Sequence, residues 1–256
     1  MIRGVLLDLD GTLLDHRSAA DAAVTAWLSG HAPGHPRLAE AAALWWALEE
    51  PHLRAWQAGE CSWEEQRRRR IRALCVELSV TVPDDLDAAF GAYASHYRQS
   101  WTAYPDAARA VAALQGFRLG VLTNGSQRMQ EAKVRAIGLD GRVGPVLTGE
   151  VLGGSYKPAR ACYTAAAEAL GLAPGEVLLV GDDVVNDVTG PAAAGMRSVW
   201  LDRHGTEPPP DGFPRITSLA ELPALPALAA QGAQGAQGAR SARAEAARSK
   251  PPTQAR

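Results

Sequence analysis

The sequence contains little cysteine. Its three cysteines, Cys61, Cys75 and Cys162, lie far apart and form no CxxC pair or Cys/His cluster. This spacing argues against a disulfide framework and a structural zinc site, because both need several ligating or pairing residues at short intervals. We therefore expect buried thiols in a protein that is kept in a reducing compartment.

Long apolar runs are also missing. No stretch approaches the ~20 apolar residues that a membrane-spanning helix needs. The opening residues, MIRGVLLD, hold one arginine and only three consecutive apolar residues before Asp8, which is too little for the apolar region of a signal peptide. We expect a cytoplasmic protein with no membrane partner.

The chain has no large excess of charge of either sign. Its formal net charge is −2, and its 26 lysines and arginines form no long basic stripe. A nucleic acid polymer is therefore not an expected partner, because such partners are bound through clustered positive charge. With 256 residues, 46% of them hydrophobic, the chain is long enough for one sizeable core and a modest second unit. We expect a small soluble substrate and a monomer or homodimer.

Apolar runs alternate with helical segments over much of the chain. Strand-like runs occupy residues 4–9, 117–123, 144–148, 176–181 and 197–201, and helical composition is found around 104–114, 126–137, 158–170 and 187–194. This alternation predicts βαβ units and an α/β fold with a Rossmann-like, doubly wound parallel sheet.

Two other segments have a different composition. Residues 15–101 are rich in Ala, Leu, Trp, Glu and Arg without a convincing strand, and predict an inserted all-helical domain. The remaining core is then 1–14 with 102–226. Residues 227–256 form a Gly/Ala/Gln repeat and a polar tail without aromatic residues, a composition typical of disorder.

Polar residues follow the predicted strands where each strand ends. They lie in the segments DLDGT (Asp8, Asp10), LTNG (Thr123), SYKP (Lys157) and GDDVVND (Asp182, Asp187). Because ligand sites of open α/β sheets lie at the carboxyl ends of the strands, these side chains are expected to converge. Four such segments in this order are a far more specific signal than any one of them, since each alone also occurs as an ordinary turn or helix cap.

The chemistry of these groups points to phosphate. Asp8 and Asp182 offer hard oxygen ligands of the kind that Mg²⁺ prefers. Thr123 and Lys157 can donate hydrogen bonds to phosphate oxygens. Beside a cation, Asp8 can attack phosphorus and form an aspartyl phosphate, while Asp10 can give a proton to the leaving oxygen and later take one from water.

In this order the motifs resemble the haloacid dehalogenase superfamily of phosphohydrolases, over about residues 1–202. The resemblance implies a phosphatase with a type 1 helical cap inserted after the first motif. The roles it implies are Asp8 as nucleophile, Asp10 as general acid/base, Thr123 and Lys157 as phosphate and charge stabilisers, Asp8, Asp10 (through its carbonyl), Asp182 and Asp187 as magnesium ligands, and Thr12, Asn124 and Gly125 as substrate-binding residues. The role of Asp183, where relatives often carry Ser or Thr, stays open.

The resemblance also ranks the possible activities. True dehalogenases lack an acid two positions after the nucleophile, so Asp10 favours phosphoryl chemistry. Phosphomutases of the β-phosphoglucomutase type share Asp10 but usually have Ser-rich residues in place of LTNG, and form the alternative enzyme class. A non-catalytic binding protein on this fold is the other alternative, although it would be expected to have lost the nucleophile or the lysine. The expected substrate is a nucleotide, a sugar phosphate or a flavin-related monophosphate.

One helix of the predicted cap carries candidate substrate contacts. An S-x-x-E pattern at Ser62 predicts a helix start, and at ~100° per residue Arg67 and Arg70 fall on the apolar stripe of that helix. We predict that one of them contacts substrate. The alternative is that both pack along apolar surface or pair with acids such as Glu40, Glu49 or Glu50.

Overall fold

The computed structural model describes residues 1–205 and 212–228. The chain divides into two compact units, one formed by Met1–Leu14 with the residues from Ala103 onward, the other by Asp15–Thr102. The predicted domain boundary at 101/102 thus lies one residue before the observed one. The predicted tail, 227–256, lies outside the described residues except for 227 and 228.

The first unit is built on a parallel sheet. In the described residues its strand order is β3-β2-β1-β4-β5-β6. The strands are β1 Gly4–Leu7, β2 Arg118–Leu122, β3 Val146–Leu147, β4 Val177–Gly181, β5 Arg197–Leu201 and β6 Arg215–Ile216. Leu7 of β1 lies opposite both Val121 and Val180. The chain therefore leaves β1, β2 and β4 at the same edge of the sheet.

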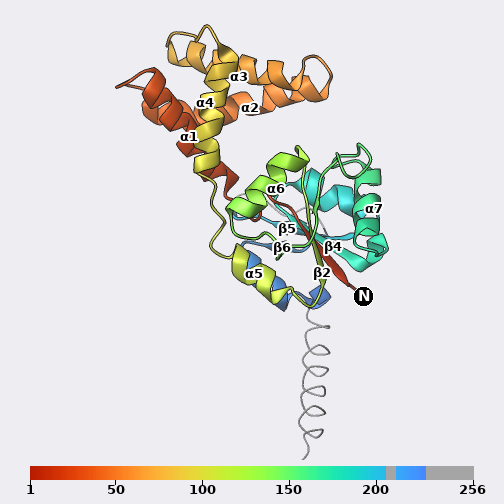
Figure 1. Ribbon diagram of the computed structural model, residues 1–256. Helices are drawn as coiled ribbons and strands as arrows, with labels where there is room; N and C mark the ends of the chain where they lie inside the picture. Colours follow the sequence, from red (N-terminus) through yellow and green to blue (C-terminus); the bar gives the residue numbers. More distant parts are fainter. Residues whose placement is uncertain (206–211, 229–256) are drawn as a thin grey trace, which may run out of the picture. The chain divides into compact units, whose positions relative to one another are not determined.

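Helices cover both faces of this sheet. They are α5 Ala107–Ala113, α6 Gln127–Ala136, α7 Arg160–Ala169 and α8 Gly190–Ala193, with short turns at η2 Pro174–Glu176, η3 Val184–Thr189 and η4 Leu219–Ala224. Figure 1 shows α5 and α6 on one side of the strands and α7 on the other. Every residue of β1 and β4 is buried, as expected for strands covered on both faces. This confirms the predicted α/β, Rossmann-like fold.

Two details differ from the sequence prediction. The strand β6 was not predicted, because Arg215–Ile216 contains only one apolar residue and forms no apolar run. The helix predicted at 187–194 is instead a π-helical turn, η3, followed by the short α8. Asp183 caps this turn by accepting hydrogen bonds from the amides of Val185 and Asn186, at 2.8 and 2.7 Å.

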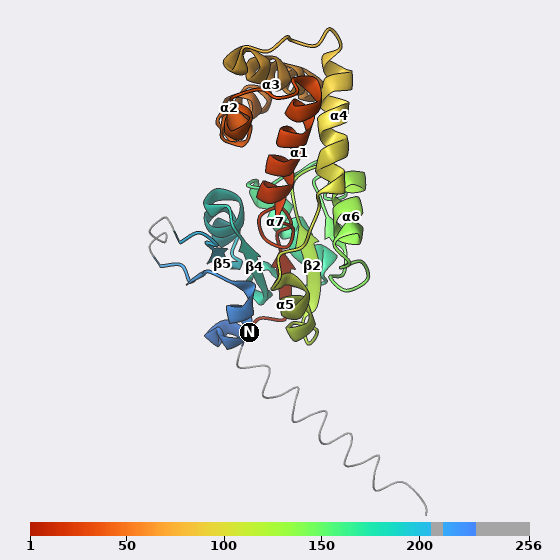
Figure 2. The same cartoon turned by 90° about the vertical axis from the view of Figure 1, so that its left-hand side faces the viewer.

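The second unit is entirely helical in secondary structure (Figure 2). Its elements are α1 His16–His31, η1 Leu38–Glu40, α2 Ala41–Gln57, α3 Trp63–Leu78 and α4 Leu86–Gln99. Side-chain caps begin three of them: Asp15 accepts from the Ser18 amide, Ser62 from Glu65 and Asp85 from Ala88. The predicted start at Ser62 is therefore confirmed, although the Glu65 carboxylate pairs with Arg69.

The core of the helical unit is partly aromatic. Trp45 is fully buried, and its indole N–H donates to the Tyr93 hydroxyl at 3.0 Å. Leu28 of α1 and Leu74 of α3 pack in the same cluster. Trp63, in the first turn of α3, lies outside this core and is 37% exposed.

The thiols are free, as expected. Cys75 and Cys162 are buried, and burial raises the pKa of each thiol to about 11. Cys61 is only half-buried, so the prediction of buried thiols was wrong for this residue. Among the described helices, none is both long enough and apolar enough to cross a membrane.

Candidate active site

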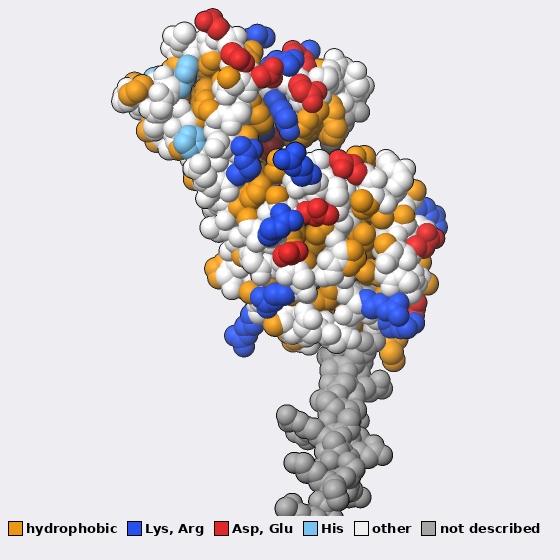
Figure 3. Space-filling model, in the orientation of Figure 1, with side chains coloured by type: hydrophobic (Ala, Val, Ile, Leu, Met, Phe, Trp, Pro, Cys, Tyr) orange, Lys and Arg blue, Asp and Glu red, His pale blue; other side chains and the backbone are white. Residues whose placement is uncertain are grey.

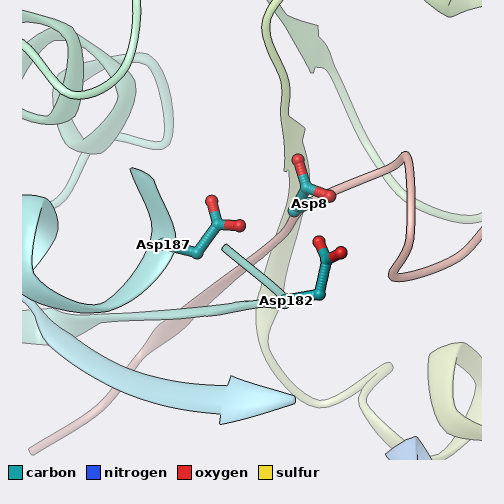
Figure 4. Close-up of side chains that lie close together, drawn as sticks. All are labelled: Asp8, Asp182 and Asp187. Atoms are coloured by element: carbon teal, nitrogen blue, oxygen red, sulfur yellow. The ribbon is translucent and has the colours of Figure 1, made fainter. Parts of the chain in front are cut away.

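Three carboxylates converge at the sheet edge. Asp8 directly follows β1, Asp182 directly follows β4, and Asp187 lies one turn further on in η3. Each offers an oxygen that lies within 4.8 Å of the others, and Figure 4 shows the three side chains directed toward one another. The predicted metal ligands with carboxylate donors are thus brought together.

Lys157 joins two of these acids. Its ammonium nitrogen lies 2.8 Å from Oδ1 of Asp8 and 2.7 Å from Oδ1 of Asp187. Burial disfavours this ammonium group, but the charges of Asp187 and Asp8 outweigh burial and raise the Lys157 pKa above its usual range. Lys157 is therefore cationic in the folded protein.

The three acids still carry more negative charge than one lysine balances. Burial raises the pKa of Asp8 well above its usual value; Lys157 opposes this shift, and Asp187 and Asp182 add to it. Burial also raises the pKa of Asp187 against the effect of Lys157. Loss of hydration and the charge of Asp187 raise the pKa of Asp182 to about 7, although Asp182 is the most exposed of the three.

This donor set fits a divalent cation. Oδ2 of Asp8 is buried and has no hydrogen-bond partner among the described residues, so one oxygen of this carboxylate is left for a cation or a phosphorus atom. All carboxylate donors are hard oxygens, which suits Mg²⁺ better than softer metals. A cation would also favour the ionised form of these carboxylates, which burial disfavours.

Gly11 allows the first motif to approach Asp182 closely. Its φ is +90°, and a Cβ on it would lie 2.1 Å from Oδ2 of Asp182. Only glycine fits such a position without displacing the carboxylate. The next residue, Thr12, is fully buried, and its hydroxyl lies 3.5 Å from Oδ1 of Asp182. Thr12, predicted to bind substrate, therefore contacts a predicted metal ligand.

Asp10 contacts two residues that sequence reasoning did not single out. Nζ of Lys133 lies 2.8 and 2.6 Å from the two carboxylate oxygens of Asp10. The side-chain amide of Gln130 donates to Oδ2 of Asp10 at 3.1 Å and to the Thr123 hydroxyl at 2.7 Å. The segment QEAK could have indicated these two residues. Its spacing places Gln130 and Lys133 on one face of α6, beside the buried Val134.

The LTNG segment lines the site and also holds the backbone of Lys157. The Asn124 side chain accepts from the Lys157 amide at 3.0 Å and donates to the Lys157 carbonyl at 2.9 Å. Thr123 is buried at the end of β2. Gly125 has φ of +121°, and its turn leads into α6. Asn124, predicted to bind substrate, thus holds the backbone of the catalytic lysine candidate in place.

These residues surround one cavity of about 210 Å³. It is lined by Asp8, Asp10, Thr123, Asn124, Lys157, Asp182, Asp183, Asn186 and Asp187. Asp183, whose role the sequence left open, lines this cavity and also caps η3. A nucleophile candidate, a proton-transfer candidate, a buried lysine and three candidate cation ligands therefore line one small cavity.

The model of the haloacid dehalogenase-like hydrolase family matches residues 2–195 of the chain. The chain belongs to this family. As a member of it, the protein is a hydrolase, and the site above occupies the matched region. The resemblance inferred from the motifs is confirmed.

Relatives in this family act on different bonds. The chain is 34% identical to the phosphoserine phosphatase of Thermus thermophilus over 188 residues, which cover 70% of this chain and 72% of that protein. It is 30% identical to the (S)-2-haloacid dehalogenase of Pseudomonas sp. strain YL over 215 residues, covering 80% and 84%. Phosphatases and dehalogenases are thus both relatives of this hydrolase.

The fold also matches solved structures of the family. One example is YfnB from Bacillus subtilis, a HAD-hydrolase solved with magnesium, which superposes with a TM-score of 0.74 over 87% of this chain and 97% of that one. The two sequences are 23% identical. The likeness confirms the α/β architecture of this hydrolase.

The two candidate arginines of the hydrolase's helical unit have different surroundings. Arg70 is buried, donates to Glu49 at 2.8 Å and lies 3.8 Å from the centre of the Trp45 ring. Arg67 lies between the rings of Trp63 and Phe90, at 4.7 and 5.0 Å. For Arg70 the structure therefore shows the pairing with Glu49 that the sequence offered as an alternative. Contact of either arginine with substrate stays a prediction.

Proposed function

We propose that the protein is a magnesium-dependent phosphatase that hydrolyses a small phosphate monoester through an aspartyl phosphate on Asp8. The observation that carries this proposal is that the carboxylates of Asp8 and Asp10 line the same cavity. Nucleophilic attack and proton transfer need two acids with different surroundings. Asp8 is buried against Lys157, whereas Asp10 is more open and pairs with Lys133.

The proposed reaction has two steps. A carboxylate oxygen of Asp8 forms a bond to phosphorus, the bond from phosphorus to the ester oxygen breaks, and Asp10 gives the departing oxygen a proton. Water then forms a bond to phosphorus and gives a proton to Asp10, and the bond between phosphorus and Asp8 breaks. Inorganic phosphate leaves, and Asp8 and Asp10 return to their starting states.

The other residues of the cavity stabilise charge in this scheme. Thr123 donates a hydrogen bond to a phosphate oxygen, and Lys157 neutralises both phosphate and Asp8. Asp8, Asp182, Asp187 and the Asp10 carbonyl would hold Mg²⁺, which when bound neutralises charge on the carboxylates and the phosphate.

The substrate in this proposal is a nucleotide, a sugar phosphate or a flavin-related monophosphate, and the site of action is the cytoplasm. On the face in Figure 3, basic and acidic side chains are interspersed among apolar ones in both units. This mixture supports a small-molecule partner, because polymers such as nucleic acids are bound through continuous basic surface. The helical unit acts as a cap that selects substrate, with Arg67 as its candidate contact, because Arg70 is already paired with Glu49.

A substrate screen tests the proposal against dehalogenation. Purified protein with Mg²⁺ is offered a panel of phosphate monoesters and, separately, (S)-2-chloropropionate, and released phosphate and chloride are measured. We expect phosphate release, and we expect the Asp8→Asn variant to lose it. Chloride release without phosphate release would overturn the proposal in favour of the dehalogenase activity that one group of relatives carries.

A further inference from the structure

Two long polar side chains of α6 are buried beneath Asp10. Lys133 is 5% exposed and Gln130 is 2% exposed. Lys133 contacts both carboxylate oxygens of Asp10, at 2.8 and 2.6 Å, and Gln130 contacts Oδ2 at 3.1 Å. The Asp10 carboxylate is therefore held by three contacts from two donor groups of one helix.

Gln130 also connects Asp10 to the phosphate-binding segment. The same side-chain nitrogen lies 2.7 Å from the Thr123 hydroxyl and 3.0 Å from the Asn124 carbonyl. The following turn packs closely on it, since a Cβ on Gly125 would lie 3.2 Å from Cδ of Gln130. One amide group thus links the candidate proton-transfer residue to the candidate phosphate ligand.

Burying these two side chains is costly for a purely structural purpose. Lysine is almost never buried unless it is paired, and an unpaired buried ammonium or amide group loses its hydration without compensation. Packing alone would be met by an apolar residue at either position, as it is at the neighbouring Val134. Asp10, which lines the cavity, is a partner that compensates Lys133.

We propose that Lys133 and Gln130 are positioning residues that fix the orientation of the Asp10 carboxyl group for proton transfer to the leaving oxygen. Lys133 contacts both oxygens of the ionised carboxylate. When one oxygen carries the proton that is given to the leaving group, the other still accepts from Lys133 and keeps the carboxyl group oriented. Gln130 fixes the distance between Asp10 and the bound phosphate because it also holds Thr123. This inference rests on the proposed phosphatase function.

The leaving group of the substrate separates this role from a general structural one. An alkyl phosphate releases a basic alkoxide, which needs a proton from Asp10, whereas p-nitrophenyl phosphate releases a phenolate that needs little help. For Lys133→Met we expect kcat/KM to fall roughly tenfold or more further with an alkyl phosphate than with p-nitrophenyl phosphate, a part of the ~10²–10⁴-fold that general acid/base catalysis supplies. Structural damage would lower both values equally.

Three further comparisons complete the test. Lys133→Arg, which keeps the charge, should recover part of the alkyl phosphate activity, and Arg135→Met, which removes an exposed charge from the same helix, should match the wild type. In an Asp10→Asn background, Lys133→Met should not change the ratio between the two esters further, because residues that act through one group are not additive. If Lys133→Met fails to fold, Lys133→Arg and Gln130→Met are compared with the wild type instead.

The outcomes are distinct. Equal losses with both esters, no loss, or full additivity with Asp10→Asn would overturn the positioning role while leaving the phosphatase proposal in place. A wild-type protein that releases no phosphate from any ester, or an Asp8→Asn variant that keeps its activity, would overturn the proposed function and this inference together.

Discussion

Lys157 donates to Oδ1 of Asp8 at 2.8 Å, and the second oxygen of that carboxylate is buried with no hydrogen-bond partner in the described part of the chain. The pairing holds the carboxylate in one orientation. It leaves Oδ2 as the atom on which a cation or a phosphorus atom can act.

Replacing Asp8 by Asn should abolish phosphate release and leave the fold intact. An amide oxygen is a poor nucleophile, while Lys157 keeps its bond to Asp187, so no buried ammonium group is left unpaired. Phosphate release and thermal unfolding of the purified variant measure the two effects. A mass-verified variant that retains a large share of wild-type turnover would rule out covalent catalysis by Asp8.

Replacing Asp10 by Asn should lower turnover by about 10²–10⁴-fold, the usual range for loss of general acid/base catalysis. Protonation of the leaving oxygen and activation of water are both impaired, so kcat falls more than KM changes. Steady-state kinetics on the best ester of the screen provides the measurement. Unchanged kcat would remove Asp10 from the proton-transfer role.

Removal of divalent cations should silence the enzyme, and Mg²⁺ should restore it better than softer metals, because the proposed ligands are all oxygen. Mg²⁺ should also raise the melting temperature, since a ligand that binds only the folded state stabilises it. Activity and melting are measured after dialysis against a chelator, with Mg²⁺ added back in a parallel sample. Full activity in excess chelator would contradict the metal site.

Arg67 and Arg70 should respond differently to replacement by Met. Arg70→Met breaks a largely buried ion pair with Glu49 and should lower the free energy of unfolding by roughly 1–3 kcal/mol, with kcat and KM nearly unchanged. Arg67 is half-buried, and its Nε has no hydrogen-bond partner among the described residues. Arg67→Met should raise KM for the best substrate while sparing p-nitrophenyl phosphate. Equal effects of Arg67→Met on both esters would rule out its contact with substrate.

Asp106 should make stability depend on pH. Burial opposes its ionisation, but hydrogen bonds from Arg203 and Ser218 outweigh burial and lower its pKa below the usual value. A folded-state pKa below the unfolded value of ~3.9 gives stability that is present above that value and is lost as pH falls through the folded pKa. Asp106→Asn should therefore lower the melting temperature more at pH 7 than near pH 3.

The same variant tests a link to the first motif. Arg203 pairs with Asp106 and donates to the carbonyls of Gly11 and Thr12, at 3.2 and 2.7 Å. Asp106→Asn should therefore also weaken the hydrogen bonds that Arg203 donates to the loop after Asp10. Asp140→Asn, at an exposed position, is the matched control. Equal melting shifts for both variants at pH 7 would contradict the role of the Asp106–Arg203 pair.

The sequence by itself determined the sheet and the main acids of the site. Runs such as GVLL and VLLVG are apolar at every position, so they had to be buried strands, and a parallel sheet brings their carboxyl ends to one edge. Asp8 and Asp182 follow those ends directly, so their meeting follows from topology. An unbroken apolar run carries this information locally, because the whole strand lies within a few consecutive residues.

Only the tertiary structure decided which polar side chains contact Asp10 and Lys157. Lys133 is 123 positions from Asp10 in the sequence. Asn124, whose side chain forms hydrogen bonds with the backbone of Lys157, is 33 positions from that residue. The sequence pattern marked Asn124 as a ligand for substrate and did not mark Lys133. A hydrogen bond of under 3 Å depends on how a helix packs on its sheet, and no spacing along the chain encodes that distance.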